Sequence, residues 1–167
     1  MPIDAKHLRG VLGSYPTGVT IVTTVDALAQ PIGVTVNSFA SLSLDPPLIS
    51  WCLRRTSYSL PAFRHSRRFI INVLGASHGA LCLRFAKGDA HKWQGVDFRP
   101  GANGCPSLAE AIATLECTHV GEYDTGDHVL MIGEITRAWA IHGAHPLVFF
   151  RGGYYELARQ NDPPLAC

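Results

Sequence analysis

Short runs of β-branched residues, each ended by a turn of Gly, Pro or Asp, are the feature that most limits how this chain can fold. Residues 19–25 read VTIVTTV and residues 69–74 read FIINVL, and such side chains fit best on a pleated strand. Further strands are predicted at 32–36, 48–53, 115–120, 129–140, 146–150 and 154–157. The last four form two hairpins, around turns at 124–127 and 151–153. Many strands closed by hairpins predict a mainly β protein built as an antiparallel barrel.

Three short helices are predicted at the periphery of this barrel. Asp4 is placed to cap a helix over residues 4–14, which has apolar residues along one face. A second helix is expected at 56–65, where Pro61 fits the first turn, and a third at 77–85, capped by Ser77. Residues 86–107 are rich in Gly and charge and predict a long connection with a lid or binding role.

Length and composition exclude several classes of protein. The 167 residues predict one domain, residues 1–158, followed by a frayed tail at 159–167. The net charge of +1 argues against a nucleic-acid binder, which normally carries a basic stripe. No apolar run approaches the ~20 residues of a membrane span, and the charged N-terminus lacks a signal peptide's apolar core. Five widely spaced cysteines without a CxxC pair predict neither a metal site nor a disulfide scaffold, and favour a reducing cytoplasm.

Residues 33–47, GVTVNSFASLSLDPP, combine the start of a strand with a series of small polar groups. A flavin ring needs donors for its carbonyls, acceptors for its N–H and a surface to lie on. The backbone of a strand edge supplies these groups in fixed geometry, and Thr35, Asn37 and Ser38 add more. The alternative is a polar edge strand that ends in an Asx or Ser turn and binds nothing.

Residues 54–59, RRTSYS, follow one predicted strand and open the second helix. Backbone N–H groups, two serine hydroxyls and an arginine at that point form an anion site suited to a phosphate. The alternative is ordinary helix capping beside solvated arginines. Arg84 and Lys87, at the end of the third helix, can add charge to the same ligand or simply complement the helix dipole.

The sequence Gly126-Asp127-His128 follows a hairpin turn, from which the histidine can reach a cleft and contact a second, planar ligand. A histidine at a turn is also commonly a structural or surface group. No Ser-His-Asp order, HExxH, Walker loop or GxGxxG occurs. Hydrolases, zinc proteases, P-loop enzymes and Rossmann dehydrogenases therefore lack support.

Taken together, these segments resemble the flavin reductase-like domain family, whose fold is the FMN-binding split barrel with Greek-key connections. The resemblance runs from about Tyr15 to Leu157 and rests on the order and spacing of its motifs. These motifs are PTGV at 16–19, TVNSF at 35–39, LDPPL at 44–48, FIINVL at 69–74, RFA at 84–86, GDH at 126–128, IGE at 132–134 and FRG at 150–152.

This resemblance implies a homodimer that reduces free FMN or FAD with NADH or NADPH and hands the reduced flavin to a separate monooxygenase. Thr35, Val36, Asn37 and Ser38 would hold the isoalloxazine ring, together with Cys52. By the same analogy Ser57 and Ser59 would hold the phosphate, Arg84 and Phe85 would flank the flavin, and His128 would contact the nicotinamide. The bulky Tyr58 departs from the family's run of small residues, which leaves the preference between FMN and FAD open.

Two other functions remain compatible with such a barrel. A flavin- or haem-binding carrier without reductase turnover would need no Gly126-Asp127-His128 signature. A relative of pyridoxamine-phosphate oxidase would need a cluster of basic phosphate ligands, of which only Arg54 and Arg55 are present. Consumption of NADH with added FMN under air separates the reductase from the carrier.

Overall fold

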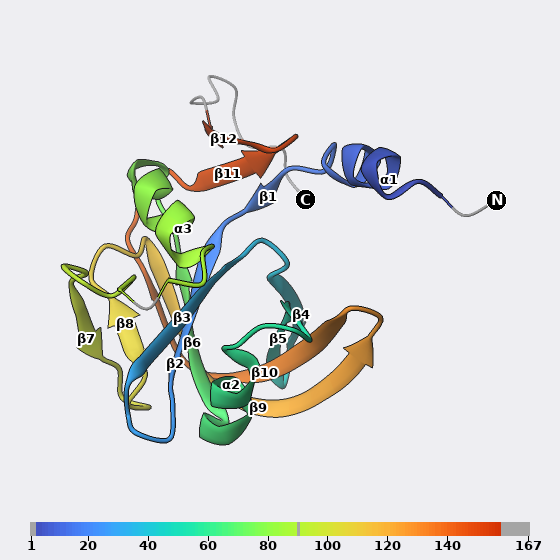
Figure 1. The fold of residues 1–167 in the computed structure, drawn as a ribbon. Helices are drawn as coiled ribbons and strands as arrows, with labels where there is room; N and C mark the ends of the chain where they lie inside the picture. The colour runs from blue at the N-terminus through green and yellow to red at the C-terminus, as the bar shows by residue number, and fades with distance from the viewer. Residues whose placement is uncertain (1–2, 90, 158–167) are drawn as a thin grey trace.

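The computed structural model describes residues 3–89 and 91–157, which build a strongly curved sheet with smaller elements around it (Figure 1). Seven strands lie in the order β3-β2-β6-β9-β10-β5-β4, and every neighbouring pair is antiparallel. Their bounds are β2 (Thr20–Val25), β3 (Pro31–Val36), β4 (Ala40–Leu44), β5 (Pro47–Arg54), β6 (Arg68–Val73), β9 (Ala113–Thr125) and β10 (His128–Ala140). The mainly β, antiparallel architecture expected from the sequence is confirmed.

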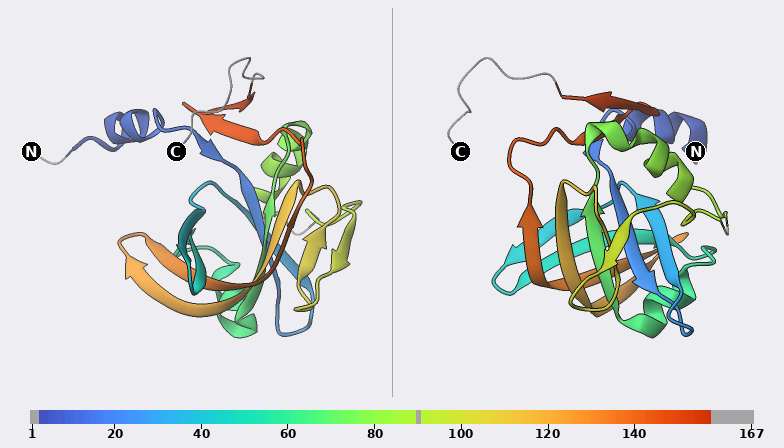
Figure 2. Two further views of the ribbon diagram at one scale, coloured as in Figure 1. Left: turned by 180° about the vertical axis from the view of Figure 1, so that it is seen from behind. Right: turned by 90° about the vertical axis from the view of Figure 1, so that its left-hand side faces the viewer.

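Smaller elements surround this sheet within the described residues. One further sheet joins β1 (Thr17–Gly18), β11 (Leu147–Phe150) and β12 (Gly153–Glu156), and another joins β7 (Phe98–Pro100) and β8 (Pro106–Leu108). The helices are α1 (Ala5–Leu12), α2 (Leu60–Ser66) and α3 (Gly79–Phe85), with a 3-10 turn η1 (Ala76–His78) before the last. Helix α1 extends away from the body of the molecule (Figures 1 and 2). None of its side chains is buried.

The hairpin of β9 and β10 bends the sheet into its barrel shape. Its pairing register shifts between Ile132 and Gly133 and again between Ile135 and Arg137, and such irregularities bend and twist a strand. At Gly133 a Cβ atom would lie 2.4 Å from Cζ of Phe69, so only glycine permits this approach to the core. The curl brings the outer edge of β3 close to β5, near the other end of the sheet.

Aromatic packing fills the inside of the curl. Trp51 of β5 lies edge-on against Phe63 of α2 and Phe69 of β6, with ring centroids 4.9 and 5.6 Å apart. Such a pair contributes about 0.5–1.5 kcal/mol beyond the burial of its area. A second cluster packs α3 and β8 against the other face of the sheet; it contains Val19, Ile21, Leu74, Cys82, Phe85, Leu108 and Leu147. Buried side chains therefore hold both faces of the curled sheet in place.

The predicted start is confirmed for one helix, α1, and differs from the observed start for α2 and α3. Asp4 caps α1 as expected, because its carboxylate accepts a hydrogen bond from the backbone N–H of His7 at 2.7 Å. Helix α2 begins only at Leu60, since residues 54–59 fold as successive turns in which Ser57 N–H donates to the Arg54 carbonyl. Helix α3 begins at Gly79 after the 3-10 turn, so the prediction that Ser77 caps it is wrong.

Two features of the sheet have no signal in the sequence. Strand β4, ASLSL, contains no β-branched residue. The 86–107 connection, expected to be a loop, contains β7 and leads through a tight turn into β8. This turn is held by the buried carboxylate of Glu116, which accepts backbone hydrogen bonds from Ala102 at 3.0 Å and Asn103 at 3.2 Å. A partner on β9 thus decides this local structure.

Three expectations drawn from the sequence concern membrane spans, the cysteines and the end of the domain. Within residues 3–89 and 91–157, no helix has the length and apolar character needed to cross a bilayer. Cys52, Cys82, Cys105 and Cys117 are free thiols, and the cytoplasmic location stays a prediction. The domain end at 158 and the tail at 159–167 lie outside the described residues.

Candidate active site

A cavity of about 360 Å³ lies between β3 and the second half of β5. Strand β4 pairs with β5 only as far as Ser50, so within the described residues the stretch from Trp51 to Arg54 has no strand partner on that side. β3 is the edge strand at the far end of the sheet order. The space is lined by Val34, Thr35, Val36, Asn37, Ser38, Cys52, Leu53, Arg54, Thr56, Ser57, Tyr58, Ser59, Phe85, Ala86, Lys87, Gly88, Lys92 and His128. Its volume lies within the range of small-molecule sites.

The β3 wall offers backbone groups more than hydroxyl groups. Thr35 Oγ1 donates to the Cys82 carbonyl at 2.7 Å, which ties α3 to β3. Ser38 Oγ accepts from Cys52 N–H at 2.8 Å and donates to the Cys52 carbonyl at 3.3 Å, which joins β5 to the end of β3. Both hydroxyls thus donate within the protein, and their role in holding a ring stays a prediction. Asn37 has an exposed side chain on the same wall.

The backbone of β3 nevertheless presents polar groups along an open edge. The Gly33 carbonyl accepts a hydrogen bond from Lys92 Nζ at 2.8 Å. Because alternate residues of an antiparallel strand point their N–H and C=O groups to the same side, we expect Thr35 to direct its backbone groups toward the side of Lys92. A planar ring with both donors and acceptors fits such an edge.

The turns at 54–59 form the floor of the cavity, and one serine there is unsatisfied. Ser59 is 1% exposed, and its hydroxyl has no hydrogen-bond partner in the described structure. It occupies the N-cap position of α2 without making a capping bond. Ser57 Oγ accepts from Ser59 N–H at 3.3 Å. A buried hydroxyl without a partner is costly, so Ser59 is suited to donate to a bound anion.

Helix α3 and the connection that follows it pack against β3 and close the cavity on that side. Phe85 is 1% exposed and meets Trp93 edge-on, with ring centroids 4.8 Å apart. Lys92 is buried beside it and contacts the hydroxyl of Tyr58 across the cavity. Lys92 was not among the site residues expected from the sequence, because one lysine in a long charged connection carries no signal of burial.

His128 stands at the first residue of β10, where it pairs with Arg54 of β5. Its Nδ1 lies 2.8 Å from Oδ1 of Asp127, and this hydrogen bond lowers the pKa of the Asp127 carboxyl. The contact fixes the ring and leaves Nε2 for a ligand. The side chain is 35% exposed, which places it at the mouth of the cavity.

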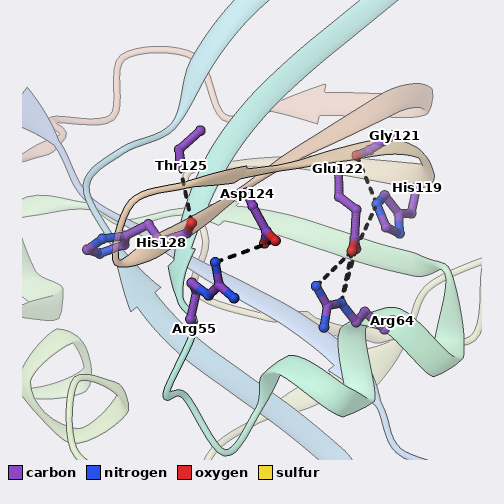
Figure 3. A network of polar contacts seen from close by, with 8 residues as sticks. All are labelled: Arg55, Arg64, His119, Gly121, Glu122, Asp124, Thr125 and His128. Carbon is purple, nitrogen blue, oxygen red and sulfur yellow. Dashed lines mark hydrogen bonds and ion pairs between the residues drawn. The ribbon is translucent and has the colours of Figure 1, made fainter.

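Polar contacts fasten the tip of the β9–β10 hairpin to the floor of the cavity (Figure 3). Arg55 pairs with Asp124 at 3.4 Å, and Arg64 of α2 pairs with Glu122 at 2.8 Å. Thr125 Oγ1 donates to the His128 carbonyl at 3.2 Å. These pairs are partly exposed, and each contributes about 0–1 kcal/mol. Together these contacts hold His128 and the turns at 54–59 in a fixed position relative to each other.

Arg84 is the one predicted site residue that the fold does not bring to this cavity. Its guanidinium donates to the Gln94 carbonyl at 3.0 Å and borders a separate cavity of about 140 Å³. Successive residues of a helix point in different directions, and here Phe85 lines the larger cavity while Arg84 lines the smaller one. Thr35, Val36, Asn37, Ser38, Cys52, Ser57, Ser59, Phe85 and His128 do line the space, although the Val36 side chain is mostly in the core.

The charge of the cavity favours an anion. Arg54, Lys87 and Lys92 line it, and the lining formed by the described residues includes no Asp or Glu. The unpartnered Ser59 hydroxyl and the open β3 edge add donors to this positive surface. A flavin nucleotide combines a planar ring rich in acceptors with a phosphate, so the residues present fit that group.

Comparisons with known proteins agree with this reading. Residues 12–158 match the family model described as flavin reductase like domain. The flavin-dependent monooxygenase reductase subunit HsaB of Rhodococcus jostii is 39% identical over 162 residues, which are 97% of this chain and 83% of that protein. A Rhizobium meliloti protein named as a probable flavin reductase is 40% identical over 152 residues, 91% of this chain; the chain spans about half of that relative, 49%.

Solved structures show the same fold. NADH:FAD oxidoreductase SgcE6 of Streptomyces globisporus, in complex with NAD and FAD fragments, has a TM-score of 0.90 and 32% identity, covering 97% of this chain and 99% of its own. The split-barrel expectation is thereby confirmed. The resemblance drawn from the sequence is confirmed as well: the chain belongs to the flavin reductase-like domain family, which includes reductase subunits of flavin-dependent monooxygenases.

Proposed function

We propose that this protein reduces FMN or FAD with NADH or NADPH and releases the reduced flavin to a separate monooxygenase. The observation that carries the proposal is the cavity itself, which combines an open strand edge, a buried hydroxyl without a partner and a lining without carboxylates. The HsaB relative, a reductase subunit, and SgcE6, solved with NAD and FAD fragments, support the same assignment.

The flavin ring would lie along β3, on the backbone of Thr35 to Ser38, with Cys52 beneath one edge and Phe85 beyond the other. The phosphate would take the hydroxyl hydrogens of Ser57 and Ser59. The Ser59 hydroxyl has no other hydrogen-bond partner in the described part of the chain. Binding of the phosphate would therefore give this buried group a charge-assisted hydrogen bond that it lacks in the free protein. Hydrogen bonds to charged groups contribute about 1.5–3 kcal/mol.

His128 would position the nicotinamide. The two cofactors carry the hydride chemistry, and the protein supplies their orientation and surroundings. Asp127 holds the imidazole through Nδ1, so the ring presents Nε2 to the carboxamide or ribose of the nucleotide. No proton has to be removed from the nicotinamide, so the role of His128 is positioning.

A homodimer is the assembly that best accounts for α1. Leu8, Val11 and Leu12 are 40–63% exposed on a helix that buries none of its own residues, and Tyr15, just after it, is 76% exposed. An apolar face left open on this scale is typical of an interaction surface. A second copy of the chain would cover it, in keeping with the dimer that the family resemblance implies.

Steady-state kinetics test the proposal directly. Oxidation of NADH and NADPH is followed at fixed concentrations of FMN, FAD and riboflavin, first under air and then without oxygen. Turnover that depends on both nucleotide and flavin, with reduced flavin accumulating in the absence of oxygen, is the expected result. Tight flavin binding without nucleotide consumption would instead indicate a carrier or electron-transfer protein.

A further inference from the structure

The most unusual charged group in the described structure is Lys92. Its side chain is on the wall of the cavity, yet the residue is only 4% exposed. Removing an ammonium group from water is expensive unless an opposite charge compensates it. Lys92 therefore needs an explanation that a surface lysine does not.

The protein partners of Lys92 are neutral. Nζ donates to the Gly33 carbonyl at 2.8 Å and contacts the Tyr58 hydroxyl. It also lies 5.0 Å from the centroid of the Tyr58 ring and 5.8 Å from that of Phe85. These contacts orient the ammonium group and lower its cost. Within residues 3–89 and 91–157, no carboxylate forms an ion pair with Lys92.

The groups that share the cavity with Lys92 do not supply the missing charge. The titratable side chains in the lining, besides Tyr58 and Cys52, are Arg54, Lys87 and His128. All three are basic, so the balancing negative charge has to arrive with the ligand. An ammonium group has three hydrogens to donate, and the two named oxygens leave one for that ligand.

We propose that Lys92 is a flavin-binding residue, whose ammonium group neutralises a phosphate of the bound flavin and is held in place by Tyr58 and Gly33. The proposal rests on the flavin site proposed above. Lys92 belongs to the connection between α3 and β7, whereas Tyr58 belongs to the serine turns. Their contact therefore joins the floor of the cavity to the connection after α3, two parts of the site that are distant in sequence.

The tyrosine that departs from the family's small residues gains a role in this arrangement. Its hydroxyl accepts a hydrogen bond from the ammonium group, and its ring covers one side of that group. A smaller residue at this position would leave Lys92 with only the Gly33 carbonyl. Tyr58 is thus a positioning residue that acts through Lys92.

Binding of FMN and riboflavin to Lys92→Met tests the proposal. Methionine keeps the length and apolar stem of lysine and removes the charge. The dissociation constant for FMN should rise at least about tenfold, the scale of one lost hydrogen bond to a charged group. The constant for riboflavin, which lacks the phosphate, should change less than about twofold. Tyr58→Phe should give a smaller loss in the same direction.

Arg99→Met is the matched control, since it removes one cation from exposed strand β7, outside this cavity. It should leave the FMN-to-riboflavin ratio unchanged. The melting temperature of ligand-free Lys92→Met should hold or rise, because replacing an uncompensated buried charge by an apolar group is commonly neutral or stabilising. A purely structural lysine would instead lower that melting temperature and leave the ratio intact.

Three outcomes would overturn the proposal. Equal losses for FMN and riboflavin would make Lys92 a wall of the ring site. Unchanged affinity for both flavins would remove it from the site. An unchanged ratio with a raised KM for NADH would assign the ammonium group to the nucleotide phosphates. If the wild-type protein bound neither flavin, the proposed function itself would fail, which the wild-type titration reveals before any variant is compared.

Discussion

Replacing Ser59 by alanine should change the stability of the free protein and its affinity for FMN in different directions. The Ser59 hydroxyl is buried without a partner and makes no capping bond to α2. An unsatisfied buried polar group costs about 1–3 kcal/mol. Removing it should therefore leave the free energy of unfolding unchanged or raise it by about 1 kcal/mol, allowing for the small space left behind.

Affinity for FMN should fall in the same variant. If Ser59 donates to the phosphate, the loss is about 1.5–3 kcal/mol, or roughly 10- to 150-fold in the dissociation constant. Riboflavin should bind as it does to the wild type, because it lacks the phosphate. Quenching of flavin fluorescence gives both dissociation constants, and denaturant unfolding of the ligand-free protein gives the stability.

Thr114→Val is the matched control for this variant. Thr114 is 1% exposed, and its hydroxyl is also buried without a partner, but it lies on β9 and does not line the cavity. Its removal should stabilise the free protein on the same scale and leave FMN affinity unchanged. A Ser59→Ala protein that loses stability while keeping its affinity for FMN would refute the reasoning, since the hydroxyl would then serve the fold.

Three further predictions concern other parts of the molecule. His128→Ala should lower kcat/KM for the nucleotide by about 1–3 kcal/mol in transition-state terms with little change in flavin Kd; unchanged nucleotide kinetics would remove His128 from the site. Cys52 is half-buried in the cavity, and burial raises the pKa of its thiol above the ordinary value of 9.0. Its alkylation should therefore be slow and should become faster as the pH rises past 9.0. Saturating FMN should protect Cys52, and equal rates with and without FMN would contradict its placement. Leu8→Glu with Leu12→Glu should convert a dimer seen by light scattering into a monomer, because both side chains are exposed on α1; a monomeric wild type would contradict the assembly.

Local patterns were sufficient to predict most of the sheet. Strand β2 consists of β-branched residues and strand β6 combines such residues with Phe69, and both were predicted within one residue of their observed bounds. The hairpin of β9 and β10 follows from the Gly126 turn, where φ is +64° and glycine is favoured. These elements depend on side-chain shape and on turn chemistry, which a sequence shows directly.

The sequence also indicated which segments form the candidate site, but not which of their polar groups are hydrogen-bonded within the protein. Small polar residues at 35–38 and serines at 57 and 59 marked both walls of the cavity. Only the folded chain decides that the hydroxyls of Thr35 and Ser38 are used by the Cys82 carbonyl and the Cys52 backbone. The same folding leaves the Ser59 hydroxyl unpaired, because partners for these groups come from distant segments.

Arg84 and Lys92 show most clearly what could not be predicted from the sequence. Both are cations in or near the connection after α3, and the sequence favoured Arg84 because it belongs to a recognised motif. The direction of each side chain depends on packing: Phe85 turns toward Gly33 and Trp93, which sends Arg84 away, while the fold of residues 91–97 buries Lys92 against Tyr58. Local side-chain patterns predicted most of the strands and turns and the family, but gave no signal for β4, β7 or β8. Only the tertiary structure decided which polar groups are left free for a ligand, because that depends on contacts between segments far apart in the chain.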